Sequence, residues 1–312
     1  MKLRRLARQR LSGAVRRVLR ITEQDRCRLS NADTVLAQVA HDSMEAAVND
    51  AVGYVKTVRD CIEPFAVRIA PVRHDDAGSE LAGKRFNALL DLLSSGVPPL
   101  PLAVAIDVAR LADSCHALNH PIEAEAWAAD AGIHFAVASS FGRKGRILAC
   151  IVRLFRPRLT LELGTAYGMS AIFIMEALRN LGLPGRLITV EGFEPQYSIA
   201  CRTLTGRYGQ AVSCRFGLTE KLLPELAQSG DAVDFMFHDA AHSGEAYVRD
   251  FNAIVGALAP GSVVVFDDIR WNDARFRRGP AGAYAGWRQV AAHARVRRAI
   301  EIGDEMGVAL LR

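Results

Sequence analysis

Hydrophobic residues follow two different periods along the 312-residue chain, and the change of period divides it into two parts. Between residues 32 and 140 they recur every three to four positions, as expected for helices with one buried face. From residue 141 onward, short apolar runs alternate with helical patterns, which is typical of parallel strands joined by helices. This order predicts an all-α N-terminal region joined to an α/β domain.

The helical part is expected to contain several separate helices. A long apolar stripe runs from Leu36 to Ile62, and breaks at 74–79 and 96–101 separate the patterns that follow. We expect those later helices at residues 80–95, 102–118 and 122–139. The predicted parts of the chain are a basic segment at 1–30, a helical region at 31–140 and an α/β domain at 141–312.

The most informative local pattern of the α/β part is residues 159–170, LTLELGTAYGMS. A strand pattern ends here, Gly164 and Gly168 bracket a turn, and an apolar helical pattern follows. In doubly wound sheets, ligands bind beyond the carboxyl ends of the strands. A dinucleotide-binding loop would need a further glycine at position 166, where this chain has Ala166. The loop therefore predicts a nucleotide-like cofactor, and a tight turn that merely needs small residues is the alternative.

A carboxylate ends the next strand pattern. Residues 186–191, RLITVE, read as a buried strand that finishes at Glu191. A carboxylate in this place accepts both ribose hydroxyls of a bound nucleotide, which no neutral side chain does as well. Glu191 is thus the expected ribose ligand whether the cofactor is NAD(P) or another nucleoside.

Two further strand patterns end in aspartates. Residues 233–239 finish at Asp239, and residues 262–268 finish at Asp267 and Asp268 after a Pro-Gly turn. If the two strands are neighbours, their ends lie about 5 Å apart. Three clustered carboxylates repel one another unless a cation neutralises them, and oxygen ligands of this kind suit Mg²⁺. The alternative is that one aspartate caps a helix and another is solvated.

The sequence motifs of these segments resemble those of a known family. V-D-F-x-F-x-D-A-x-H-S, followed by P-G and V-V-V-F-D-D-I-R-W, is similar to the class I S-adenosylmethionine-dependent O-methyltransferases with a catechol O-methyltransferase-like core. The bacterial subgroup with D-x-x-H and D-D-I-x-W has the most similar motifs, and the resemblance covers residues 141–312. It implies a Rossmann-like, seven-stranded methyltransferase sheet that closes with an antiparallel hairpin.

The resemblance also implies roles for single residues. The metal-ligand positions of the family correspond to Asp239, Asp267 and Asp268, and the catalytic positions correspond to His242 and Asp239. The expected residues around S-adenosylmethionine are Glu162, Gly164, Thr165, Ala166, Gly168, Ser170, Glu191, Gly217, Leu218 and Asp239.

One departure from the family concerns the base. Metal-dependent members usually carry D-A-D-K, whereas this chain reads D-A-A-H and so has His242 at the lysine position. An imidazole, with an ordinary pKa near 6.5, can accept a hydroxyl proton at neutral pH. The loss of the second aspartate weakens the inference of a metal. His238 lies inside an apolar strand pattern and is interpreted as a core histidine.

The positive charge of the chain is concentrated at its N-terminus. Eight of the 39 basic residues lie in residues 1–20, which contain no acid, so the remaining 31 face 34 acidic residues. The domain is therefore not expected to bind nucleic acid. The basic segment could form a helix packed on the body, a weak contact with an anionic membrane, or a transit peptide.

Two compositional features favour a cytoplasmic protein. No apolar run reaches eighteen residues, and the six cysteines lack a C-x-x-C spacing. In the family that the chain resembles, N-terminal helices often cover the active site or form a homodimer interface.

The expected activity is transfer of a methyl group from S-adenosylmethionine to a hydroxyl of a small molecule, with Mg²⁺ as a candidate second cofactor. An NAD(P)-dependent oxidoreductase and a non-catalytic methyltransferase-like module are the alternatives. The acceptor cannot be inferred from the fold.

Overall fold

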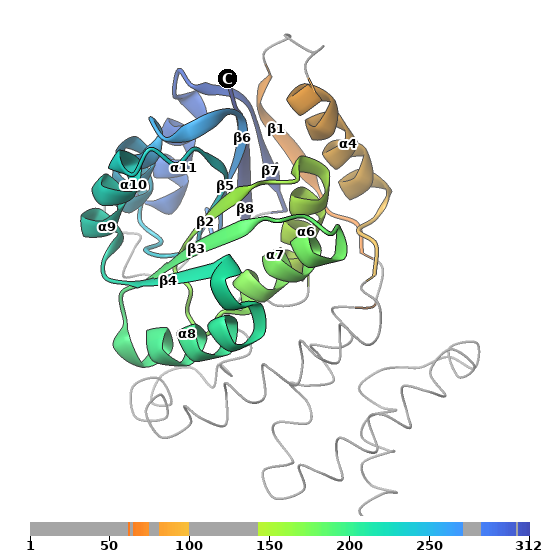
Figure 1. Cartoon of the computed structure of the whole chain (residues 1–312). Helices are drawn as coiled ribbons and strands as arrows, with labels where there is room; N and C mark the ends of the chain where they lie inside the picture. The colour runs from red at the N-terminus through yellow and green to blue at the C-terminus, as the bar shows by residue number, and fades with distance from the viewer. Residues whose placement is uncertain (1–61, 63–64, 75–80, 100–142, 271–281, 304) are drawn as a thin grey trace, which may run out of the picture. The chain divides into compact units, whose positions relative to one another are not determined.

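The structure is a computed structural model that describes residue 62 and residues 65–74, 81–99, 143–270, 282–303 and 305–312 (Figure 1). The chain divides into two compact units, one of residues 1–63 and 99–143 and one of residues 64–98 and 144–312. Only residues 62, 99 and 143 of the first unit are described, so the account that follows concerns the second.

The second unit is built on one eight-stranded sheet with the order β1-β7-β8-β6-β5-β2-β3-β4. Its strands are β1 (Ile69–His74), β2 (Leu159–Leu163), β3 (Arg186–Glu191), β4 (Val212–Phe216), β5 (Val233–His238), β6 (Leu258–Phe266), β7 (Val296–Ile302) and β8 (Met306–Leu311). Strands β4, β3, β2, β5 and β6 are parallel, whereas β8, β7 and β1 pair antiparallel.

Helices cover both faces of the sheet. They are α4 (Leu81–Ser95), α6 (Arg143–Phe155), α7 (Met169–Asn180), α8 (Glu194–Tyr208), α9 (Thr219–Gln228), α10 (Gly244–Ile254) and α11 (Ala283–Ala292), with the short 3₁₀ helix η2 (Gly209–Ala211). In Figure 1, α6, α7 and α8 lie on one side of the sheet and α9, α10 and α11 on the other. The predicted Rossmann-like α/β fold is confirmed, and none of the described helices has the length and apolarity needed to cross a bilayer.

The side of the sheet to which successive strands are added changes at β2, in the middle of the sheet. From β2 the chain adds β3 and β4 on one side, and then returns to place β5 and β6 on the other side of β2. The ends of β2 and β5 therefore form a switch point of the kind where doubly wound sheets bind ligands. Every expected site residue of the second unit lies on β2, at the end of β3, or on a segment that follows β2, β4, β5 or β6.

Apolar runs form the central strands because both faces of the sheet are covered. All five residues of β2 are buried, and residues 263–266 of β6 have no exposed surface. Trp287 of α11 is also fully buried against this core. Each large side chain buried in this way contributes about 1.5–3 kcal/mol to folding.

Strand β1 corrects two predictions. The sheet has eight strands rather than seven, and residues 69–74 form a strand within a region that was expected to be all-α. Strand β1 is an edge strand paired with β7 alone, so Pro71 is tolerated there and the apolar pattern is short. Residues 64–98 accordingly belong to the same compact unit as the sheet.

Other predictions have mixed outcomes. The helix expected at 80–95 is α4, and the closing hairpin is the antiparallel pair of β7 and β8. Strand β6 begins at Leu258, before the Pro-Gly pair that was expected to precede it. The helices expected at 102–118 and 122–139, the stripe before Ile62 and the basic segment at 1–30 lie outside the described residues.

Candidate functional site

The glycine loop after β2 is packed directly against the end of β5. Gly164 has a φ of 89°, and a Cβ atom placed on it would lie 2.2 Å from the carbonyl oxygen of Asp239. The Asp239 N–H in turn donates to the carbonyl of Leu163 at 2.8 Å. Only glycine fits at position 164, because a side chain there would meet the backbone and would also strain this left-handed conformation.

Glu162 lies beneath this loop and is fully buried. Its two carboxylate oxygens accept hydrogen bonds from the hydroxyls of Ser170 and Thr189, each at 2.5 Å. Burial raises the pKa of Glu162 to about 7, although both hydroxyl donors act in the opposite direction. The carboxylate thus joins β2 to β3 and α7, and in this conformation it supports the loop from below rather than lining an open surface. Thr165 is also buried, and its hydroxyl forms a hydrogen bond with the hydroxyl of Thr189.

Glu191 lies at the end of β3 and is held by backbone groups. One carboxylate oxygen accepts the N–H of Ala166 at 2.7 Å, and the other accepts the N–H of Phe193 at 2.8 Å. Burial raises the pKa of Glu191, while these backbone donors act in the opposite direction. Each oxygen keeps a further lone pair, so the carboxylate is oriented and can still accept a diol.

An exposed apolar patch borders Glu191. Phe193, Phe216 and Leu218 are each 51 % exposed, at the ends of β3 and β4. The Gly217 N–H donates to the carbonyl of Glu191 at 2.9 Å, which keeps the two segments together. A flat apolar ring such as adenine would cover such a patch. The sequence predicted Gly217 and Leu218 here but not the two phenylalanines: Phe193 follows β3, Phe216 ends β4, and neither belongs to a motif.

The ends of β5 and β6 bring the second group of site residues together, as predicted. The Asp267 N–H donates to the carbonyl of His238 at 2.9 Å, so the two strand ends are direct neighbours. One side-chain ligand atom each from Asp239, His242 and Asp268 lies within 4.8 Å of the others. The His242 Nε2 atom is 3.7 Å from Asp239 Oδ1 and 3.9 Å from Asp268 Oδ2.

Asp267 lies outside that group of three in this structure, and its role as a metal ligand stays a prediction. Its side chain is 3 % exposed and pairs with Lys144 Nζ at 3.0 Å. Burial raises the pKa of Asp267 to about 6, against the lowering effect of Lys144. The set that the described residues offer to a cation is Asp239, Asp268 and the imidazole of His242.

Lys144 is a site residue that the sequence did not reveal. Its ammonium lies 3.0 Å from Asp267 Oδ2 and 2.7 Å from Asp268 Oδ1. Burial alone would lower the pKa of Lys144, but the two carboxylates outweigh it and raise this pKa well above its usual value. Lys144 stands at the start of α6, 123 residues before Asp267, and no local pattern links the two segments.

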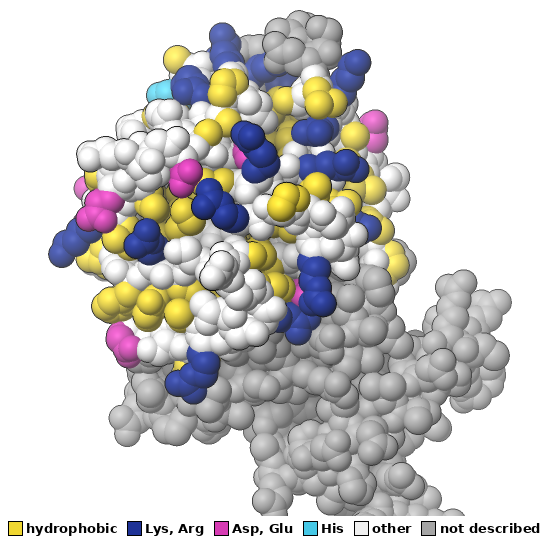
Figure 2. All heavy atoms as spheres, in the orientation of Figure 1, with side chains coloured by type: hydrophobic (Ala, Val, Ile, Leu, Met, Phe, Trp, Pro, Cys, Tyr) yellow, Lys and Arg dark blue, Asp and Glu magenta, His cyan; other side chains and the backbone are white. Residues whose placement is uncertain are grey.

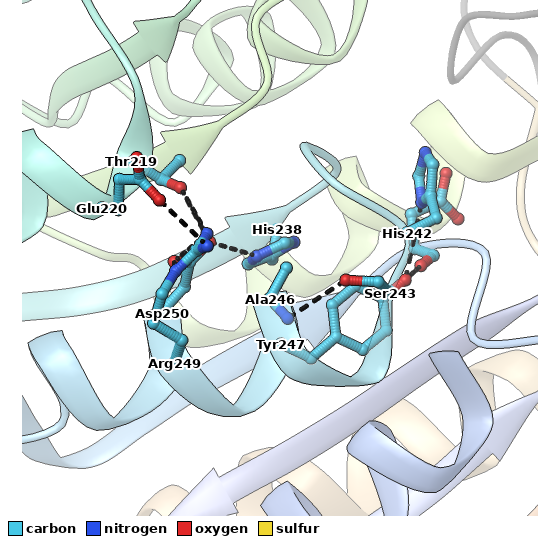
Figure 3. A network of polar contacts seen from close by, with 10 residues as sticks. Thr219, Glu220, His238, His242, Ser243, Ala246, Tyr247, Arg249 and Asp250 are labelled. Carbon is cyan, nitrogen blue, oxygen red and sulfur yellow. Dashed lines mark hydrogen bonds and ion pairs between the residues drawn. The ribbon is translucent and has the colours of Figure 1, made fainter. Parts of the chain in front are cut away.

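The Nδ1 side of the His242 ring, opposite to the Nε2 atom that faces the aspartates, lies against Tyr247. His242 immediately precedes Ser243, whose hydroxyl caps α10 by accepting the Ala246 N–H. The Tyr247 hydroxyl donates to the carbonyl of Asp267 at 2.5 Å and lies 3.5 Å from His242 Nδ1, at the outer limit of a hydrogen bond (Figure 3). Burial lowers the pKa of His242, although the charge of Asp268 acts in the opposite direction.

His238 has the structural role that was predicted for it. It is fully buried, its ring stacks on Phe266, and its Nε2 atom lies 3.0 Å from Asp250 Oδ2. The same carboxylate oxygen accepts the Thr219 hydroxyl at 2.9 Å, which ties α10 to the start of α9 (Figure 3). This network fixes the segment that contains Leu218.

Figure 2 shows how charged side chains are distributed over one face of the molecule. Among the described residues of that face, Lys and Arg side chains are scattered singly between apolar and acidic ones.

Comparisons with known proteins agree with this geometry. Residues 161–269 match the family described as "Methyltransferase domain". Two relatives named catechol O-methyltransferase are 32% identical over 133 residues (Mus musculus) and 30% identical over 129 residues (Niastella koreensis). Each alignment covers 40% of this chain, and 48% and 56% of those proteins respectively. The chain thus spans about half the length of the curated relatives it matches.

A solved structure shares the fold. The O-methyltransferase TomG from Streptomyces achromogenes, involved in tomaymycin synthesis and determined in complex with S-adenosylmethionine, superposes with a TM-score of 0.51 at 22% identity. The superposition covers 64% of this chain and 89% of that one. At this level of identity the likeness shows the methyltransferase fold alone.

Proposed function

We propose that this chain, whose residues 161–269 match the methyltransferase domain family, is a class I S-adenosylmethionine-dependent methyltransferase that transfers the methyl group to a hydroxyl of a small molecule. One observation carries the proposal: the carboxylate of Glu191, at the end of β3, and the half-buried imidazole of His242, just after β5, lie at the same edge of the sheet. Strand β2 lies between β3, which ends at Glu191, and β5, which leads to Asp239. Two strand spacings separate these ends by about 10 Å.

That spacing suits one extended cofactor. The ribose would bind Glu191, and the adenine would cover Phe193, Phe216 and Leu218. The sulfonium end would then cross the loop at Gly164 and present its methyl group beside Asp239 and His242. Backbone approach at the loop is possible because the residue there has no side chain.

The reaction would be an in-line displacement. The acceptor oxygen forms a bond to the methyl carbon while the carbon–sulfur bond breaks, and the electron pair of that bond stays on sulfur. S-adenosylhomocysteine and a methyl ether are the products. Such a step needs alignment of the two reactants and removal of the hydroxyl proton.

His242 would accept that proton through Nε2. The Nδ1 side of the ring faces the Tyr247 hydroxyl, and a hydrogen bond that the ring donates to the Asp267 carbonyl holds it in place. This leaves the Nε2 lone pair toward the aspartates, where the acceptor hydroxyl would lie. A lowered pKa keeps the imidazole neutral, and therefore competent as a base, at neutral pH.

A divalent ion such as Mg²⁺ would be held by the carboxylates of Asp239 and Asp268, whose ligand atoms lie within 4.8 Å of each other and of a ring nitrogen of His242. When bound there, it would lower the pKa of the acceptor hydroxyl. The proton transfer to His242 does not depend on that contribution.

Several finer expectations belong to the same proposal. We infer a cytoplasmic protein, in keeping with the free thiols of the described cysteines, Cys150, Cys201 and Cys214. A homodimer, the absence of nucleic-acid binding and a weak membrane contact of residues 1–20 also stay predictions.

The function is tested by incubating the full chain with methyl-labelled S-adenosylmethionine and a panel of catechols, other phenols and sugars. We expect label in the methyl ether of at least one acceptor class, and none with the His242→Ala variant. Binding of S-adenosylmethionine without transfer to any hydroxyl would favour the non-catalytic module. Transfer to nitrogen or carbon instead would contradict the proposed acceptor.

A further inference from the structure

The carboxylate cluster at the ends of β5 and β6 already contains a cation, the ammonium of Lys144. Its Nζ atom contacts Asp267 at 3.0 Å and Asp268 at 2.7 Å, and its side chain is 21 % exposed. Glu305 lies 3.8 Å away but is 63 % exposed, so water screens that contact. Among the described residues, the ammonium thus forms ion pairs with three carboxylates, and those of Asp267 and Asp268 contact it directly.

This placement has a physical reason. The side chain of Asp267 is nearly inaccessible to water, and an ionised carboxylate in such a place is costly unless a cation compensates it. Lys144 supplies that charge from the first turn of α6. It also fixes one oxygen of Asp268, which leaves the other, Oδ2, toward His242.

The same contact affects any divalent ion. Asp268 belongs both to the pair with Lys144 and to the group of three that would hold a metal. An ion bound to Asp268 would lie within a few ångströms of the ammonium, and like charges at such a distance repel strongly in a partly buried site.

We propose that Lys144 is the resident cation of this site and that it competes with divalent ions for Asp268. The lysine positions Asp267 and Asp268 without a metal, and it keeps the affinity for Mg²⁺ or Mn²⁺ low. Divalent ions then bind tightly only where the lysine is removed. The inference rests on the proposed function for the role of this site in methyl transfer, but its test measures metal binding itself.

The test is a calorimetric titration of the full chain with Mn²⁺, comparing the wild type with Lys144→Met. We expect the dissociation constant for Mn²⁺ to be lower in the variant than in the wild type by roughly tenfold or more, because a repelling charge has been removed. A lysine that only stabilised the fold would give unchanged or weaker metal binding, and that result would overturn the proposal. Lys144→Gln, which keeps hydrogen bonding without the charge, gives the same reading if Lys144→Met does not fold.

Two controls locate the effect. Lys84→Met removes the same charge from an exposed position on α4 and should leave Mn²⁺ affinity unchanged. Adding Asp268→Asn to Lys144→Met should abolish the gain, and a gain that persists would place the ion elsewhere and contradict the proposal.

A parallel titration with S-adenosylmethionine separates the two claims. If the cofactor binds and Mn²⁺ affinity does not rise in the variant, the proposal for Lys144 fails while the proposed function stands. If Mn²⁺ affinity rises but the cofactor does not bind, the proposed function fails instead.

Discussion

The proposed site has a cofactor end at Glu191 and an acceptor end at Asp268, and the two ends hold their carboxylates by different means. At the cofactor end, Glu191 accepts the backbone N–H groups of Ala166 and Phe193 at 2.7 and 2.8 Å. At the acceptor end, Asp268 is held by the ammonium of Lys144 at 2.7 Å. The first carboxylate is fixed by neutral groups of the main chain, and the second by a full charge on a side chain with four rotatable bonds.

This difference indicates how each end can respond to a ligand. Backbone donors cannot leave Glu191 without unfolding the loop, so the cofactor end is preorganised for one diol. A lysine side chain can move, so the acceptor end can exchange its cation or adjust to a substrate. The cofactor end should therefore be sensitive to the loss of single hydrogen bonds, and the acceptor end to changes of charge.

The largest expected effect is at the acceptor end. His242→Ala should reduce kcat about 10²–10⁴-fold, the usual contribution of a general base. Steady-state transfer of labelled methyl groups measures it, and cofactor affinity should stay unchanged because the histidine lies at the other end. Wild-type turnover should fall on the acid side with a midpoint below 6.5, since burial lowers the pKa of His242 and the neutral ring is the active form. A variant with full turnover would remove His242 from the mechanism.

The next effect concerns stability at the cofactor end. The pKa of Glu162 is raised to about 7, so its stabilising contribution is complete below its ordinary pKa and is lost as the pH rises through 7. Between about pH 5 and about pH 8, the free energy of unfolding of the wild type should fall by about 3 kcal/mol more than that of Glu162→Gln. Urea unfolding at several pH values measures this difference. Parallel curves for the two proteins would show that the carboxyl group does not titrate in this range.

A smaller loss is expected from the ribose ligand. Glu191→Ala should weaken S-adenosylmethionine binding by about 1.5–3 kcal/mol, because charged hydrogen bonds to the diol are removed. Glu194→Ala, which removes an exposed carboxylate three residues later, is the matched control and should bind normally. Calorimetry measures both, and equal affinities in the two folded variants would contradict the ribose assignment.

The smallest expected effect is at the N-terminus. Deleting residues 1–20 should leave cofactor affinity unchanged, since the segment holds no glycine-loop or aspartate chemistry. The deletion should also abolish co-sedimentation with anionic lipid vesicles. In the full chain this binding should be weaker at physiological than at low salt, because salt then screens exposed charges over about 8 Å. Loss of cofactor binding in the folded, truncated chain would show that this segment covers the site.

The sequence predicted the sheet well where strands are central. Strands β2, β3, β5 and β6 are buried on both faces, so they appear as near-continuous apolar runs that end in recognisable residues. Strand β1 has one neighbour and contains Pro71, so its pattern was too weak to separate it from the helices around it.

Side-chain groupings were harder to predict than strand ends. Asp267 and Asp268 both contact Lys144, but the Asp267 side chain is buried whereas the second oxygen of Asp268 lies toward His242, a difference that their adjacent positions in the sequence do not reveal. Lys144 and Phe193 were missed because tertiary packing, not a motif, brings them to the site. Contacts of this kind depend on how helices lie on the sheet, which the periodicity of a sequence does not contain.

The most direct test of the central claim is a calorimetric titration of the full chain with S-adenosylmethionine and, in parallel, with NADH. We predict saturable binding of S-adenosylmethionine at one site per chain, with NADH weaker by about tenfold or more, because Ala166 replaces the glycine that a pyrophosphate needs. Preferential binding of NADH, or no binding of S-adenosylmethionine to the folded protein at millimolar concentration, would contradict the assignment of this site.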